Sequence, residues 1–153
     1  MIEWSEQHLM VRDMVRGFIE KEIAPNIDEL EHGDTPPYDV LRKLIKTFGM
    51  DTMAKSQFDA QIKKAKAIEA GEISEEEASK SSDQMGGGNQ DMAAISFIPM
   101  IELCKYCPGM VTAMGVSMGL GGASLMSKGT IEQKERWALH VLTLKKVCPC
   151  AIT

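Results

Sequence analysis

The chain has 153 residues, the length of one typical domain, and it is 44% hydrophobic and 25% charged, with a net charge of −5. This modest acidic charge, without a basic stripe, argues against nucleic acid as a partner. The 12 methionines and the 5% share of aromatic residues predict an aliphatic, methionine-filled core. The start, Met1–Trp4, lacks a basic segment followed by an apolar one, so we expect no secretion signal and a cytoplasmic protein.

An amphipathic helix is predicted to begin near Glu6, because apolar residues recur every three or four positions as far as Leu30. Ser5 is a suitable N-cap for this helix. Trp4, which precedes the cap, can pack on Leu9 as a hydrophobic staple.

Pro25 has no backbone N–H group, so it should kink or break this helix near Ala24. A turn rich in Gly and Pro follows at residues 32–37. The apolar spacing then predicts a second helix over residues 38–48, which ends at Gly49.

A polar and acidic segment with few apolar residues follows the second helix. We interpret residues 58–90 as a solvated insertion that ends in a glycine-rich joint at residues 86–89. Ser74–Glu77 has the pattern of a capping box, so short helices are possible within the insertion.

Helical apolar spacing returns over residues 91–104 and continues in a nearly uninterrupted apolar helix over residues 110–126. Tyr106–Ser127 carries no charge, but its glycines, proline and hydroxyl groups favour a helix covered by protein on most sides over a membrane span. A second capping box, Thr130–Gln133, begins a helix that extends to Leu144.

The cysteines allow one metal hypothesis, in which Cys104, Cys107, Cys148 and Cys150 supply four thiolates to zinc or iron. The first pair continues a predicted helix and the second pair has unusual spacing, so free thiols are the favoured interpretation and no metal ligand is assigned.

The glycine-rich segment Gly115–Gly122 lacks the Lys-Ser/Thr pair of a phosphate-binding P-loop and the strand that precedes a dinucleotide-binding loop. Its small residues indicate close approach of a neighbouring helix or of a ligand, and packing is favoured. The three histidines, His8, His32 and His140, lie far apart in the sequence and near no nucleophile pattern. No carboxylate is expected in an apolar setting that would raise its pKa for acid or base work, so no catalytic residue is assigned.

Residues 4–25 contain Arg12 and Arg16 and end in E-I-A-P, and residues 129–137 read G-T-I-E-Q-K-E-R-W. The first stretch resembles the opening helix of acyl-CoA dehydrogenases, with its arginine spacing, and the second resembles that family's G-T-x-E-Q-K-x-R-[WY] helix start. Residues 151–153 resemble the beginning of A-[LIV]-T-E-P, the segment that opens the family's middle β-domain. The resemblance covers residues 2–50 and about 91–153.

The resemblance implies an all-α fold, an orthogonal or up-down helical bundle of the acyl-CoA dehydrogenase N-terminal type, over residues 1–144. Residues 145–153 would be an unpaired, β-like start of the middle domain. It also implies FAD as cofactor and the α,β-dehydrogenation of acyl-CoA thioesters, as in fatty-acid oxidation. Full-length family members form homo-oligomers.

By the same resemblance, Thr153 corresponds to the threonine that hydrogen-bonds the flavin, and Ile152 to a residue that contributes backbone contact. Cys150 lies at the position of a flavin-side aromatic residue. The family's catalytic base belongs to the domains expected after Thr153. We therefore expect a truncated or degenerate chain that is inactive alone.

The sequence departs from the family pattern at its C-terminal end. Cys148 and Pro149 replace small residues, and Leu144-Lys145 replaces the usual Gly-Glu turn. Two rival hypotheses stay open: a non-catalytic helical module that binds a partner protein through the same apolar face, and the thiolate metal site.

Overall fold

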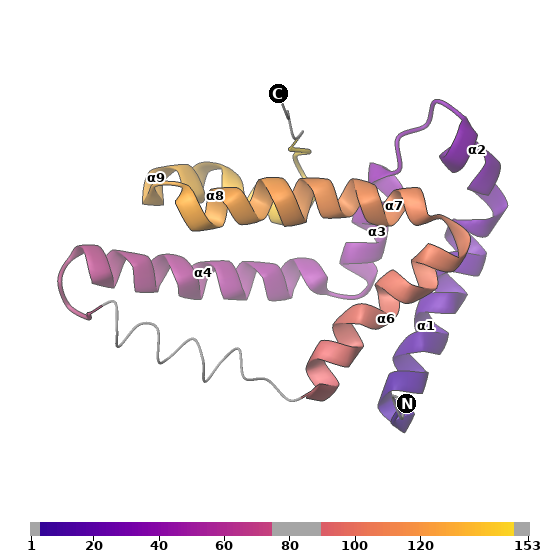
Figure 1. Cartoon of the computed structure of the whole chain (residues 1–153), viewed down its shortest axis with the longest axis horizontal. Coiled ribbons are helices and arrows are strands. Elements are labelled where there is room, and N and C mark those ends of the chain that lie inside the picture. The colour runs from indigo at the N-terminus through magenta and orange to yellow at the C-terminus, as the bar shows by residue number, and fades with distance from the viewer. Residues whose placement is uncertain (1–3, 75–89, 149–153) are drawn as a thin grey trace. The chain divides into compact units, whose positions relative to one another are not determined.

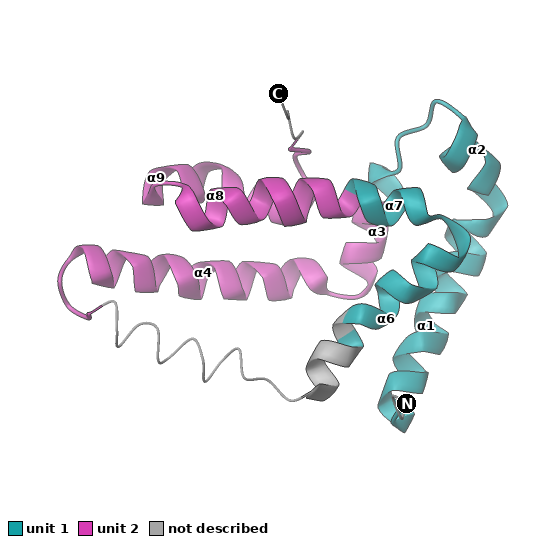
Figure 2. Ribbon diagram, viewed as in Figure 1, with its two compact units in different colours: residues 1–40, 87–113 teal, residues 41–86, 114–153 magenta. Residues whose placement is uncertain are grey.

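A computed structural model describes residues 4–74 and 90–148 of the chain. Every regular element in these two ranges is helical (Figure 1), so the predicted all-α class is confirmed. The chain packs as two compact units, residues 1–40 with 87–113 and residues 41–86 with 114–153 (Figure 2).

In the first unit, helix α1 covers Glu6–Glu22 and is capped by Ser5, as predicted. The Ser5 hydroxyl accepts a hydrogen bond from the His8 backbone N–H at 3.4 Å, and the Ser5 backbone N–H donates to His8 Nδ1 at 3.1 Å. A histidine thus completes the capping box in which glutamate or glutamine is usual. The Trp4 ring meets the His8 ring edge-on, with the ring centroids 5.6 Å apart.

The predicted break at Pro25 is confirmed. Helix α1 ends at Glu22, the short 3₁₀ helix η1 covers Ala24–Asn26, and α2 covers Ile27–His32. Proline fits the first turn of η1, where its missing N–H group would have no intrahelical partner.

Helix α6, Gln90–Tyr106, packs along α1 within the first unit, and α7, Pro108–Met114, follows it. This confirms the helix expected over residues 91–104. Pro99 lies inside α6 and is tolerated there. The buried apolar side chains that α1 and α6 contribute are Val15, Phe18, Ile19, Ile98 and Leu103. Their spacing on α1 is that of the predicted apolar stripe.

Helix α3 covers Tyr38–Thr47, close to its predicted bounds. Gly49 then adopts φ +65°, a conformation that suits glycine, and begins helix α4, Met50–Glu69. The segment expected to be a solvated insertion begins within α4, and two of its side chains are not solvated. Phe58 and Ile62 of α4 are buried and pack with Ala138.

Phe58 and Ile62 lie one helical turn apart, so they give α4 a buried side although polar residues dominate its composition. The later part of the predicted insertion, residues 75–89, lies outside the described residues.

The second unit continues with the π-helical segment η2, Gly115–Gly122, and helix α8, Ala123–Lys128. Thr130 then caps α9, Ile131–Gln133, through the predicted capping box, with hydrogen bonds of 3.2 and 3.0 Å between Thr130 and Gln133. The π-helical segment η3, Lys134–Ala138, and α10, Leu139–Leu142, complete the predicted helix.

The β-like closing segment is described only as far as Cys148, and no strand forms in this part. Residues 149–153 lie outside the described residues.

One described helix, Pro108–Lys128, is long and apolar enough to cross a membrane, a property shared by core helices of soluble proteins. The expectation that this helix is covered on most sides is wrong for its middle, because Gly115, Gly119 and Leu120 are exposed.

Candidate functional site

The glycine-rich segment η2 is a π-helix, a rare form that is frequent at functional sites. Within it, the Ser117 hydroxyl is buried and accepts a hydrogen bond from the Cys148 backbone N–H at 3.0 Å. This bond fixes the beginning of the closing segment on η2.

Two glycines of η2 serve packing. A β-carbon at Gly121 would lie 2.6 Å from the Sγ atom and 2.7 Å from the Cβ atom of Cys148. A β-carbon at Gly122 would lie 3.1 Å from Leu142 Cδ2 of α10. For these two positions the packing interpretation is confirmed, because only glycine allows the closing segment and α10 to approach η2 this closely.

The other two glycines of η2 are open to their surroundings. A β-carbon at Gly115 or Gly119 would meet no atom of the described residues within 4 Å, and both glycines are exposed. Leu120 beside them is 53% exposed. We call the surface of Gly115, Gly119 and Leu120 the open face. It offers backbone and one aliphatic side chain, so a flat or extended apolar ligand can lie against it in van der Waals contact.

The turn before the closing segment has unusual backbone geometry. Leu144 has φ +52°, the one non-glycine residue with positive φ in the described parts of the chain. Its side chain is fully buried, and its carbonyl accepts a hydrogen bond from Arg42 Nε at 2.7 Å. Burial and this hydrogen bond hold a conformation that glycine adopts more easily.

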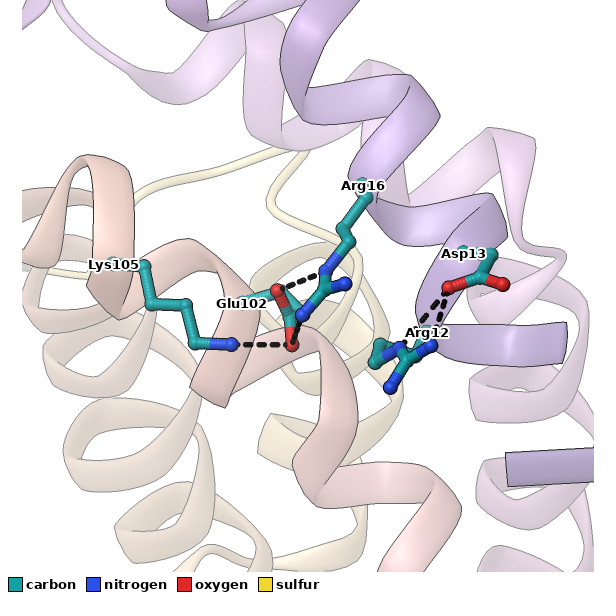
Figure 3. A network of polar contacts seen from close by, with 5 residues as sticks. All are labelled: Arg12, Asp13, Arg16, Glu102 and Lys105. Atoms are coloured by element: carbon teal, nitrogen blue, oxygen red, sulfur yellow. Dashed lines mark hydrogen bonds and ion pairs between the residues drawn. The ribbon is translucent and has the colours of Figure 1, made fainter. Parts of the chain in front are cut away.

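A buried carboxylate lies in the first unit, between α1 and α6 (Figure 3). Glu102 Oε2 accepts from Arg16 Nε at 2.8 Å, and Oε1 accepts from Lys105 Nζ at 2.8 Å. Burial alone would raise the Glu102 pKa, but the hydrogen bonds from Arg16 and Lys105 outweigh it, and the pKa lies below 4.5. The hydrogen bond between Arg16 and Glu102 also raises the Arg16 pKa. Both groups are therefore ionised near neutral pH.

The sequence did not single out Glu102 as a buried carboxylate, although it is the one charged residue between Met92 and Cys104. Its setting lowers its pKa, which agrees with the expectation that no carboxylate is placed where its pKa would be raised for acid or base work. A carboxylate that already accepts hydrogen bonds from two cations is suited to joining helices and poorly suited to acting as a base.

The comparison with models of protein families assigns the chain to a family. The model described as "Acyl-CoA dehydrogenase, N-terminal domain" matches residues 5–57 and 78–144. The chain belongs to the acyl-CoA dehydrogenase family. Residues 58–77, between the two matched ranges, include the last part of α4.

A curated relative in the acyl-CoA dehydrogenase family is the caffeyl-CoA reductase–Etf complex subunit CarC of Acetobacterium woodii. It is 28% identical over 152 residues, which cover 98% of this chain and 32% of the relative. The chain therefore spans about a third of the length of that relative. No solved structure gives a significant match.

The three residues expected to meet the flavin in this family, Cys150, Ile152 and Thr153, lie outside the described residues. Their positions as site residues stay predictions. The structure does place Cys148, two residues earlier in the chain than Cys150. Cys148 lies against Gly121 of η2.

The cysteine positions bear on the rival metal hypothesis. Cys104 is exposed, whereas Cys107 is buried. Burial, followed by a hydrogen bond to Glu31, raises the Cys107 pKa to about 11. A thiol with this pKa is a poor metal ligand, because metals bind the thiolate. Within residues 4–74 and 90–148, no three His, Cys, Asp or Glu side chains are grouped to hold a metal ion.

The histidines also have separate positions. His32 and His140 are exposed, and His8 is buried at the cap of α1. For His8, the cap geometry gives a structural role that does not require catalysis.

Proposed function

We propose that this chain is the N-terminal helical domain of an FAD-dependent oxidoreductase that acts on acyl-CoA thioesters. The family match is the main support for this proposal. We assign the open face on η2 to contact with the acyl chain and the flavin. Bound FAD would supply the redox chemistry of the α,β carbon–carbon bond, while the protein would orient the substrate. The relative is named a reductase, so the reaction could run toward reduction as well as dehydrogenation.

Within this proposal, Thr153 and Ile152 would contact the flavin ring, and Cys150 would lie at the ring-side aromatic position. The hydrogen bond between Cys148 and Ser117 supports this assignment, because it holds Cys148, which lies two residues before Cys150 in the sequence, against the helix that carries the open face. A threonine hydroxyl is a suitable hydrogen-bond partner for a flavin ring.

We further propose that the 153 residues alone have little dehydrogenase activity. No charged residue occurs between Tyr106 and Ser127, so this helix brings no catalytic base to the open face.

Spectroscopy of the purified chain tests the proposal. We expect little flavin absorbance after dialysis against FAD, and no bleaching on addition of acyl-CoA. Addition of the remaining domains of a family member as a separate polypeptide should restore both signals. Strong acyl-CoA-dependent bleaching by the chain alone would disprove inactivity, and a failure to restore any signal would count against the proposed domain role.

A helical interaction module is the second candidate, and the relative's name as a subunit of a complex with Etf favours it. In this version, the open face binds another protein, either an electron-transfer flavoprotein or a complete dehydrogenase subunit. Size-exclusion chromatography of mixtures should show co-elution that Leu120→Lys abolishes. Co-elution unaffected by Leu120→Lys would exclude the open face as the binding surface.

We also propose a cytoplasmic location, which the sequence composition supports. The apolar helix Pro108–Lys128 makes fractionation of cells a useful test. The chain should remain in the soluble fraction at low salt, whereas recovery only from detergent-extracted membranes would contradict this location.

A further inference from the structure

Helices α1 and α6 leave a cavity between them in the first unit, on the side of the Glu102 cluster. Its volume is about 160 Å³, similar to that of a protein cavity that holds benzene. It is therefore large enough for a small organic molecule. Its polar wall consists of Arg12, Arg16, Glu102 and Lys105.

The polar wall has an excess of positive charge. Three cations line it, and one of the two neighbouring carboxylates, Glu102, is nearly fully buried and accepts from both Arg16 and Lys105. The other carboxylate, Asp13, accepts from Arg12 (Figure 3). Three cations against two carboxylates leave one positive charge, so a monovalent anion would make the cluster neutral.

Arg12 is the cation best able to accept a new partner. The Arg12 guanidinium donates hydrogen bonds to Asp13, the next residue in the chain, whose side chain is 64% exposed. An exposed pair of this kind contributes little free energy, and adjacent residues of a helix do not face each other. A ligand carboxylate could therefore replace Asp13 on the planar guanidinium at little cost, and arginine binds carboxylates through two parallel hydrogen bonds.

The remaining wall is apolar. It is formed by Trp4, which precedes α1, by Leu9 of α1 and by Ile98 and Ile101 of α6, with the ring of His8 beside Trp4. Trp4 and Ile101 are 39% and 43% exposed, so they mark the edge at which a ligand would enter. An apolar body placed here would bury carbon surface on both helices.

We propose that this cavity binds a small monocarboxylate whose apolar body is about the size of a benzene ring. The single excess charge favours a monoanion over divalent phosphate, and the apolar wall favours a ring or branched alkyl group over a bare inorganic ion. This site is separate from the open face and does not depend on the proposed dehydrogenase role.

Titration with benzoate tests the proposal, with Trp4 fluorescence as the readout. The chain has two tryptophans, so Trp137→Phe leaves Trp4 as the sole tryptophan. In this background, benzoate should change the fluorescence saturably, and added salt should weaken the binding. Benzyl alcohol, the neutral analogue, and inorganic phosphate should each bind at least about tenfold more weakly, because each lacks one of the two required features.

Arg12→Gln should weaken benzoate binding by about tenfold or more, whereas Arg12→Lys should retain part of it. Arg136→Gln is the matched control, since Arg136 lies in the second unit against Trp137 and should leave binding unchanged. Circular dichroism checks that each variant is folded. The proposal is overturned if benzoate does not bind, if benzyl alcohol or phosphate binds equally well, or if Arg12→Gln has no effect in a folded protein.

Discussion

Arg16 of α1 and Glu102 of α6 join two helices through a hydrogen-bonded ion pair, with Arg16 Nε 2.8 Å and Nη2 3.3 Å from the two carboxylate oxygens. The residues are 86 positions apart in the sequence. The carboxylate is nearly fully buried, whereas the arginine side chain is 38% exposed. The pair therefore neutralises a buried charge at the contact between the helices.

Arg16→Met should lower the melting temperature by several degrees, because it leaves the buried Glu102 carboxylate with Lys105 as its remaining cation partner. Thermal unfolding followed by circular dichroism measures the change. Arg12→Met is the matched control, since the pair of Arg12 with Asp13 joins neighbours on the surface and should contribute little. Equal losses in the two variants would contradict the assigned role of Glu102.

Stability should also fall in acid because of Glu102. Its pKa is lower in the folded state than its ordinary value of 4.5, so its contribution is present above pH 4.5 and is lost as the pH falls through the folded-state pKa. Urea unfolding between pH 6 and pH 3 measures this loss. Glu102→Gln, which cannot ionise, should show a shallower pH dependence, and an unchanged slope would exclude Glu102 as the source.

Gly121→Ala should destabilise the chain by about 1–3 kcal/mol, since its new methyl group would overlap the Cys148 side chain. The Cys148 backbone cannot easily retreat while Ser117 accepts its N–H. The methyl group of Gly119→Ala, in the same π-helical segment, would meet no atom within 4 Å in the part of the chain that the structure describes, so this change should stabilise by up to about 1 kcal/mol. Urea denaturation compares the two, and equal effects would show that Gly121 is not needed for close packing.

A double variant shows whether the loss of stability in Gly121→Ala comes from the steric overlap with Cys148 or from a change in the geometry of the helix. Both atoms closest to the added methyl belong to the Cys148 side chain, so Cys148→Gly should recover much of the loss in the Gly121→Ala background. If stability is not recovered, the loss has another origin.

The cysteines should differ in reactivity. Cys104 is exposed and should react with iodoacetamide at pH 8, whereas Cys107 should react slowly because it is buried and its pKa is raised to about 11. At that pH, roughly one Cys107 side chain in a thousand is a thiolate. Peptide mass spectrometry measures both rates, with urea-unfolded chain as the control in which the rates converge. Rapid labelling of Cys107 in the folded chain would contradict its burial.

The ends of the helices were predictable because the signals that set them are local. Ser5 and Thr130 satisfy backbone donors within the next three residues, and Pro25 lacks a donor of its own. Gly49 adopts the positive φ that its position requires. The family motif at residues 129–137 was recognisable for the same reason, since it forms one continuous stretch of sequence.

The extent of α4 was harder to predict. Its sequence is mostly polar, and it is ordered by contacts of Phe58 and Ile62 with Ala138, a residue far along the chain. The composition of α4 reflects its solvent-exposed side. The local sequence does not show which distant segment will cover Phe58 and Ile62, so their burial could not be predicted from it.

The sequence by itself determined the helical class, the capped and proline-broken helix ends and the family, because each depends on local hydrogen bonding, apolar periodicity or contiguous motifs. Only the tertiary structure decided which glycines of η2 receive neighbours and which stay open, and that Glu102 is buried between α1 and α6. The physical reason is that burial depends on segments distant in the sequence. Two identical glycines, Gly119 and Gly121, differ only in what lies opposite them.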